Sequence, residues 1–320
     1  MPLRTGQFLA IAGLAIKELL RQPVCLLLAL TASALTILLP QAIAHQMGQQ
    51  ISLARDSALA FQLVFGVMLA GYAAGSTLYS ECVSGTALTV FSRPVGRETF
   101  FLAKLAAVAV LLGLFVWISI AGAMIAGCLA PHYFETDVSG LISATLVFPL
   151  ALGCAAFLNF KWNYSFPASA FLITPIFLSI AALVVGSHDH AGNRLAFASR
   201  LDWRLVSAGI MGGLALLLLA SIALTIATRM KPAPTIALLT VIFSAGLISD
   251  YLVTTSSCLP PLSFSLRALL PNIQAFWMAD DLAGGGAIPG HTIWGGIAYA
   301  AAYITGTASL GILLFRQRDF

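Results

Sequence analysis

Residues 101–130 read FLAKLAAVAVLLGLFVWISIAGAMIAGCLA, an apolar run with a single charged side chain, Lys104. A helix needs about 20 apolar residues to cross a hydrocarbon core about 30 Å thick. Further apolar runs lie on either side of this one, at 23–44, 57–80, 140–158, 166–186, 206–228, 235–253 and 291–315. Backbone groups inside lipid must be paired within their own segment, so each run predicts a helix. The sequence therefore predicts an all-α, polytopic transmembrane bundle of about eight spans (six to eight), forming a single domain over residues 1–320.

The composition supports this fold class. Apolar residues make up 59% of the chain and charged residues 9%, with a mean hydropathy of +0.95. Soluble domains carry about 25% charged residues. The net charge of +4 does not indicate a nucleic-acid partner. The cysteines lie in or beside the apolar runs without a C-x-x-C spacing, so we expect neither a disulfide framework nor a bound metal or other cofactor.

The basic residues predict the orientation in the membrane. Cytoplasmic segments of membrane proteins carry an excess of lysine and arginine. If the N-terminus is cytoplasmic, 11 of the 16 basic residues lie on that side, namely Arg4, Lys17, Arg21, Arg93, Arg97, Lys104, Lys161, Arg229, Lys231, Arg316 and Arg318. The outer side then holds five, Arg55, Arg194, Arg200, Arg204 and Arg267. We therefore expect both termini in the cytoplasm. The loop 187–205, which this orientation places outside, carries three arginines. Either the charge rule is violated there, or a neighbouring run does not span the membrane.

Two segments outside the spans are more apolar than ordinary connecting loops. Residues 3–21 place a few charges on an apolar stretch, which is typical of a helix lying in the membrane interface. The run that follows is as long as a full span and starts late for a signal peptide, so we expect it to be retained. Residues 254–290 form the longest outer loop, and their apolar content predicts short helices on the outer leaflet or over the bundle.

Residues 81–100, ECVSGTALTVFSRPVGRETF, form the most informative polar segment. Its first half mixes apolar with small polar residues, and Pro94 disfavours helical geometry in the residue before it. Arg97 and Glu98 then open the next long helix. The pattern predicts a coupling loop at 81–98 that contains a short amphipathic helix across the cytoplasmic mouth. A simple interfacial connector is the alternative.

Several kinds of chemistry lack their sequence signatures. The centres of the runs contain almost no carboxylates, and Asp250 lies near the outer end of its run, which argues against an ion-coupled carrier. No H-E-x-x-H or G-x-x-x-x-G-K-[ST] pattern occurs, so we expect no enzyme and no ATP hydrolysis by this chain.

The group His188-Asp189-His190 is a candidate metal pair, with ordinary solvated loop residues as the alternative. The spacing of Gly71 and Gly75 indicates close helix packing without identifying the partner helix.

The segment after the second run carries a family resemblance. Glu81-x-x-x-Gly85-Thr86, followed by Ser92-Arg93-Pro94-Val95-x-Arg97 and then Lys104, resembles the cytoplasmic signature of ABC transporter permeases of the ABC-2 type. Weaker similarity covers 17–23 near the start, and 270–276 and 315–320 near the end. The middle, 130–255, matches only as apolar spans. Six spans are usual in that family, so eight would be a departure.

The resemblance implies a specific assembly. Residues 82–92 would be a coupling helix seated in a groove of a partner ABC ATPase, which would bind ATP and magnesium, and 3–21 would be a connecting helix. A second permease copy, identical or different, would complete an exporter in a bacterial inner membrane, surrounded by lipid. The residues expected at or beside the ATPase contact are Glu81, Gly85, Thr86, Arg93, Pro94 and Arg97. Headgroup anchoring is the alternative for Arg93, Arg97 and Lys104. A secondary carrier or channel, and a membrane-anchored scaffold or enzyme, are the alternative functions, and the sequence does not indicate a substrate.

Overall fold

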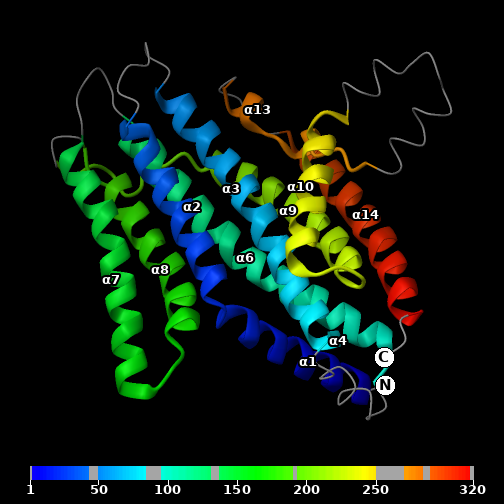
Figure 1. Ribbon diagram of the computed structural model, residues 1–320. Coiled ribbons are helices and arrows are strands. Elements are labelled where there is room, and N and C mark those ends of the chain that lie inside the picture. The colour runs from blue at the N-terminus through cyan, green and yellow to red at the C-terminus, as the bar shows by residue number, and fades with distance from the viewer. Residues whose placement is uncertain are drawn as a thin grey trace, which may run out of the picture.

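The computed structural model describes residues 2–42, 50–83, 95–130, 137–189, 193–249, 270–283 and 289–317, which form a bundle of helices (Figure 1). An isolated β-bridge between His188 and Arg194 interrupts this helical pattern. The α-helices are α1 (Pro2–Leu20), α2 (Pro23–Ala42), α3 (Gln50–Ala74), α4 (Ser80–Val83), α6 (Arg97–Leu129), α7 (Val138–Trp162), α8 (Phe166–Gly186), α9 (Arg204–Ala227), α10 (Pro232–Leu247), α13 (Ala279–Ala283) and α14 (Gly290–Arg316). A π-helix, η1 (Gly75–Tyr79), joins α3 to α4, and a 3-10 helix, η3 (Gln274–Phe276), precedes α13.

Within the described part of the chain, seven helices are long and apolar enough to span a membrane: α2, α3 with η1, α6, α7, α8, α9 and α14. The predicted all-α polytopic bundle is confirmed, and seven lies within the expected range of six to eight. The remaining run, 235–253, overlaps α10, which has only 16 residues. It is shorter than the roughly 20 residues that a full crossing requires.

The outward face of α7 is apolar, as expected of a helix that faces lipid. Val138, Ile142, Leu146 and Leu150 follow one another at a spacing of four residues and are each at least half exposed. Residues four apart lie on the same side of a helix, so these side chains form one continuous apolar stripe. Such a stripe is costly in water and favourable against lipid tails. The packing of α7 thus agrees with the membrane assignment.

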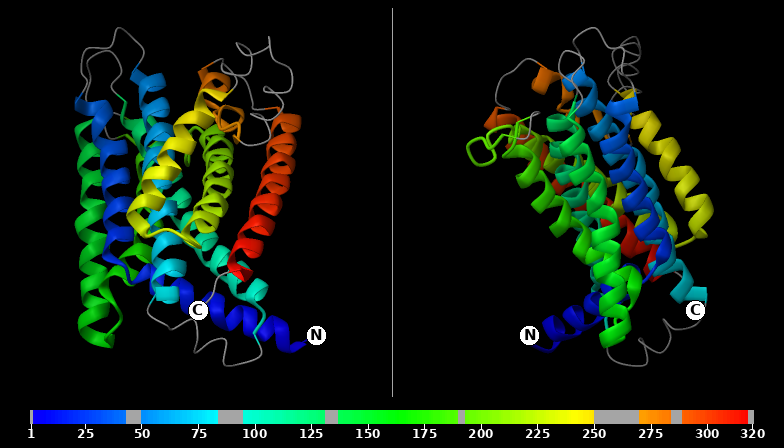
Figure 2. Two further views of the ribbon diagram at one scale, coloured as in Figure 1. Left: turned by 45° about the vertical axis from the view of Figure 1, so that its right-hand side comes forward. Right: turned by 90° about the vertical axis from the view of Figure 1, so that its left-hand side faces the viewer.

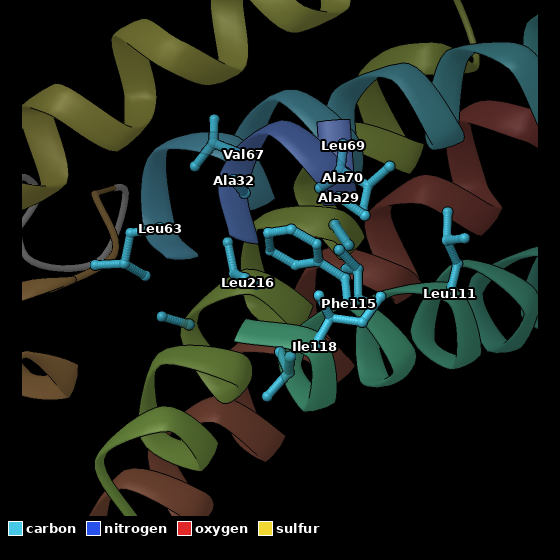
Figure 3. Close-up of a cluster of buried hydrophobic side chains, with 14 of the residues drawn as sticks. Ala29, Ala32, Leu63, Val67, Leu69, Ala70, Leu111, Phe115, Ile118 and Leu216 are labelled. Carbon is cyan, nitrogen blue, oxygen red and sulfur yellow. The ribbon is translucent and has the colours of Figure 1, made fainter. Parts of the chain in front are cut away.

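Helix α6 lies at the centre of the molecule. It contacts α1, α2, α3, α8, α9 and α14 and is buried along most of its length. Figure 3 shows Leu111, Phe115 and Ile118 of α6 meeting side chains of α2, α3 and α9, with Leu216 of α9 among them. Close packing is the main attraction between helices in lipid, because lipid tails are as apolar as the side chains. The run quoted at the start is therefore the axis on which the other helices assemble.

The glycines at 71 and 75 of the α3–η1 helix set its distance from α10. A Cβ on Gly71 would stand 3.1 Å from the Cα of Ile236, and one on Gly75 would stand 2.6 Å from the Cα of Pro232. A side chain at Gly75 would collide with backbone, which cannot rotate away, and one at Gly71 would make an unusually tight contact. The partner that the sequence left unidentified is therefore the first half of α10.

Polar contacts also join the spans. The hydroxyls of Ser221 and Thr307 lie 2.6 Å apart, and Thr225 donates to the carbonyl of Thr307 at 3.0 Å, which fastens α9 to α14. Such hydrogen bonds between membrane helices each contribute about 0.6 kcal/mol on average.

Helix α1 crosses one end of the bundle at an angle to the spans, as Figures 1 and 2 show. It buries Ala12, Ala15 and Leu19 against its neighbours, whereas Leu9 and Leu14 are about two-thirds exposed. A crosswise helix with an exposed apolar side is the arrangement expected of the predicted interfacial helix. We call this end of the bundle, which also holds α4, the α7–α8 turn and the last turn of α14, the basal end, and the opposite end the distal end.

The two ends group the basic residues as the sequence predicted. By the bounds of their elements, the helix ends and turns at the basal end carry Lys17, Arg21, Arg97, Lys104, Lys161, Arg229, Lys231 and Arg316, and those at the distal end carry Arg55, Arg194, Arg200 and Arg204. Within the loop 254–290, the described residues 270–283 contain η3 and α13, short helices of the kind expected there.

Candidate functional site

A buried ion pair joins α4 to α6 at the basal end. The side chain of Lys104, in the second turn of α6, is 2% exposed, and its ammonium group pairs with the carboxylate of Glu81 on α4. The same ammonium lies 5.4 Å from the ring centre of Phe100. A buried charge without a partner costs several kcal/mol, so the presence of Glu81 is what allows Lys104 to be buried here. The pair fixes the end of α4 against the central helix.

Glu18 brings α1 into the same cluster. Burial raises the pKa of Glu18, the nearby Glu81 carboxylate and a hydrogen bond with it raise the pKa further, and Lys104 opposes the shift. We call Glu18, Glu81 and Lys104 the basal triad. Two carboxyl groups thus lie near one ammonium, and repulsion from the Glu81 carboxylate adds to burial in favouring the protonated form of Glu18. Sequence reasoning missed the role of Glu18, because nothing in the local pattern of α1 shows that this residue faces Glu81.

A second contact joins the first turn of α6 to the last turn of α14. Arg97 donates to the carbonyl of Arg316 at 2.5 Å and to that of Phe315 at 3.4 Å. The last carbonyls of a helix lack partners within the helix, and a cation there also complements the helix dipole. The side chain of Arg316 pairs in turn with Glu98. The rings of Phe100 and Phe315 stack with centres 5.8 Å apart. We call this set of contacts the α6–α14 clasp.

The predicted coupling residues divide into two groups. Glu81 and Arg97 are described, and both side chains reach other helices of the bundle through the triad and the clasp. The other four predicted residues lie outside the described residues, namely Gly85, Thr86, Arg93 and Pro94. The alternative of headgroup anchoring is wrong for Lys104, because its side chain is buried and paired. The predicted amphipathic helix falls mostly within 84–94, also outside the described residues.

The π-helix η1 lies directly before Glu81. It begins at Gly75, which packs against Pro232 of α10. The side chain of Thr77, in the middle of the π-helix, is buried. Its hydroxyl has no hydrogen-bond partner within the described part of the chain. π-helical turns are rare and often occur at functional sites. The helix leading to the triad is thus irregular where it meets α10.

The distal end carries a separate cluster of charges. Arg200 donates to the carbonyl oxygens of His188 and Cys128, each at 2.6 Å, and lies 3.3 Å from the carboxylate of Asp137. Asp202 pairs with Arg55 at 2.7 Å and with Arg204 at 2.9 Å. Arg200 and Arg204 are therefore compensated by carboxylates, which gives a physical reason for the excess of arginine in the loop 187–205.

The electrostatics of Asp202 follow from these contacts. Burial alone would raise its pKa, but hydrogen bonds from Arg204 and the charge of Arg55 outweigh burial and hold the pKa below its usual value. The carboxylate is thus stabilised in its charged form. The distal cluster holds the α8–α9 loop onto α3 and α9.

The candidate metal pair is only partly described. The Nδ1 atom of His188 lies 2.8 Å from the carbonyl oxygen of Val184, and His190 lies outside the described residues. Within the described ranges, no three histidine, cysteine or acidic side chains are placed to hold a metal ion together. The geometry therefore adds nothing in favour of a metal site here.

An apolar groove of about 860 Å³ opens along the bundle between α9, α10 and α14. Its walls include Ile222, Ile242 and Leu310, with the phenol rings of Tyr299 and Tyr303 on the α14 side. A mostly apolar cavity with a few polar groups is the usual form of a small-molecule site. The groove therefore has the chemistry to hold an apolar or amphipathic molecule.

Comparison with known proteins does not identify a relative: no family model matches the chain, and no curated protein matches it.

Proposed function

We propose that this chain is the membrane-spanning permease subunit of an ATP-driven ABC transporter of the ABC-2 type, an exporter of a bacterial inner membrane with its basal end in the cytoplasm. The proposal draws on the resemblance carried by residues 81–104, on the seven apolar helices and on the bias of basic residues to the basal end. A phosphate-loop motif is missing from the sequence, so a separate ATPase would supply the energy.

One observation carries the proposal furthest. Glu81 of the basal triad lies just before the segment 84–94 in sequence, and Arg97 of the α6–α14 clasp lies just after it. Through the triad and the clasp, these two flanking residues connect to α1, α6 and α14. A force applied to 84–94 would reach all three helices through short polar contacts. This is the mechanical connection that a coupling segment requires.

The proposed cycle follows from that connection. ATP and magnesium bind in the partner ATPase, and closure of two ATPase subunits moves residues 82–92 of two permease copies. The triad transmits the movement to α1 and α6, and the clasp transmits it to α14. Since α14 forms one wall of the apolar groove, its displacement would change the width of the groove. The groove is the proposed route for an apolar or amphipathic substrate.

Affinity purification of the tagged chain from native membranes tests the proposal. We expect an ATPase that contains a phosphate loop to co-purify in equal amount, and the complex to hydrolyse ATP. Arg93→Glu should release the ATPase or abolish coupled hydrolysis. Arg194→Glu is the matched control, because it makes the same charge change at an exposed distal position. The proposal fails if no such ATPase accompanies the wild-type chain, or if a cysteine placed at Gly85 is labelled from outside intact cells.

A further inference from the structure

A second groove, of about 500 Å³, lies at the basal end between the end of α1 and the α7–α8 hairpin. Its two walls differ in chemistry. One carries the cationic side chains of Lys17 and Arg21, whereas the other is apolar, with Leu158 from α7 and Leu172 and Ile173 from α8. We call this the basal groove. A cavity with a positive end and an apolar end is shaped for an amphiphile that carries a negative head.

The positive charge in the basal groove is not compensated within the described part of the chain. Lys17 and Arg21 are exposed and lie four residues apart, on the same side of the chain as it leaves α1. Neither side chain forms an ion pair with a described residue. The acidic residue next to Lys17, Glu18, interacts instead with Glu81 and Lys104 in the basal triad. The two cations are therefore available to an anion that enters the groove.

The tip of the hairpin shows the depth at which the groove opens. Phe160, Trp162 and Tyr164 are 88%, 52% and 61% exposed, and the ammonium of Lys161 lies 4.9 Å from the ring centre of Trp162. Exposed tryptophan and tyrosine beside a lysine are typical of the boundary between lipid and water. Figure 1 shows this tip reaching the level of α1. The cations thus lie at headgroup height, and the apolar wall runs toward the hydrocarbon.

The polar rim of the groove is held in place by the turn itself. Asn163 has a left-handed backbone, with φ of 54°, and its N–H donates to the carbonyl of Asn159 at 3.0 Å. The side-chain amide of Asn159 donates in turn to the carbonyl of Tyr164 at 2.5 Å. These bonds fix the tip, so the side chains of Asn163 and Ser165 line the groove from a closed turn. A preorganised rim loses little entropy when a ligand binds.

We propose that the basal groove binds one anionic phospholipid of the surrounding membrane. Lys17 and Arg21 bind its phosphate, Ser165 offers a hydroxyl to the headgroup, and an acyl chain lies along Leu158 and Ile173. A zwitterionic lipid carries a compensating ammonium, so the two uncompensated cations favour a lipid with net negative charge. The bound lipid would join α1 to the α7–α8 hairpin. This inference requires only that the chain lies in a membrane, and it stands whether or not an ATPase partner exists.

Native mass spectrometry of the purified full-length chain in detergent tests the site. The probes are phosphatidylglycerol and phosphatidylcholine with identical acyl chains. We expect one phosphatidylglycerol to bind in preference to phosphatidylcholine. Each basic residue near a membrane surface strengthens the binding of anionic lipid about fivefold. Lys17→Gln with Arg21→Gln should therefore weaken this binding about thirtyfold, and each single substitution about fivefold.

Two further variants make the test specific. Arg229→Gln with Lys231→Gln removes the same charge from the same end outside the groove, and it should leave binding unchanged. Ala168→Phe fills the apolar part and should weaken binding without a change of charge. The proposal is overturned if the Lys17 and Arg21 double variant binds like the parent, or if the control double variant loses as much. It is also overturned if Ala168→Phe has no effect, or if inorganic phosphate or an acidic peptide displaces the lipid. Where the double variant does not fold, the two single variants decide.

Discussion

Replacing Lys104 by methionine should destabilise the bundle by about 3 kcal/mol at pH 7, because it removes one partner of a buried ion pair. Methionine keeps the length and most of the volume of the lysine chain, so the packing around Phe100 and the other buried neighbours is retained. The change leaves the Glu81 carboxylate, whose side chain is 16% exposed, facing Glu18 without a cation.

The size of the effect has an upper limit. A carboxylate without a partner can be relieved by taking up a proton, and for a glutamate with an ordinary pKa near 4.3 this costs about 3.7 kcal/mol at pH 7. The limit falls by about 1.4 kcal/mol for each pH unit below 7. In the variant the folded chain holds a proton that the unfolded chain has released, so its stability falls as pH rises. Glu18, whose pKa is already raised in the parent by burial, contributes to the same slope.

Unfolding in mixed micelles of SDS and a mild detergent, measured between pH 5 and pH 7.5, provides the assay. The variant should recover most of its loss at pH 5. Adding Glu81→Gln to it removes the orphaned charge and should leave a loss below about 1.5 kcal/mol. Lys161→Met is the control, since that lysine is exposed at the hairpin tip and its loss should cost less than about 1 kcal/mol. A Lys104→Met protein as stable as the parent at pH 7 would refute the role of the ion pair.

Three further outcomes are expected. Gly75→Ala should cost about 1–3 kcal/mol in the same unfolding assay, since its Cβ would meet the backbone of α10. The control, Gly295→Ala, meets nothing within 4 Å and should be neutral or stabilising. Equal effects of the two substitutions would contradict the close packing. Because the pKa of Asp202 is lowered, its contribution to stability should be present above about pH 4 and lost as the pH falls further. Asp202→Asn should abolish that part of the acid dependence, which is measured as the stability of the two proteins against pH. A double-mutant cycle of Ser221→Ala and Thr307→Ala should give a coupling energy of about 0.6 kcal/mol, and additivity within error would show that the hydroxyls are independent.

The helices themselves were predictable because lipid allows few alternatives. The run 101–130 corresponds to α6, and 166–186 matches α8 residue for residue, because an apolar segment of this length has no other way to pair its backbone groups. The run 235–253 shows the limit of this reasoning. Its helix, α10, begins at Pro232 and ends at Leu247, so it has 16 residues, a length that hydropathy alone did not indicate.

The contacts between helices were not predictable from local pattern. Lys104 was placed in the cytoplasmic segments from its position near the start of a run, and only the fold shows that α4 brings Glu81 onto it. In the loop 187–205, Arg204 has its partner Asp202 two residues away in sequence, whereas the pairs of Arg200 with Asp137 and of Arg55 with Asp202 became evident only in the assembled fold. Spacing along the chain identifies which residues share a face, but it does not identify the helix opposite that face.

The π-helix at Gly75–Tyr79 has a consequence for how this chain can tolerate a change of length. A π turn accommodates one residue more than a regular helix, and each residue of a regular helix turns the chain by about 100°. Removing one residue between 75 and 79 would convert the widened turn into ordinary helix while Glu81 kept its orientation toward Lys104. The same deletion a few turns earlier would swing every later side chain by about 100° and separate the two charges. The π-helix is thus the stretch of this long helix where one residue can be deleted while the residues that follow keep their orientation toward α6.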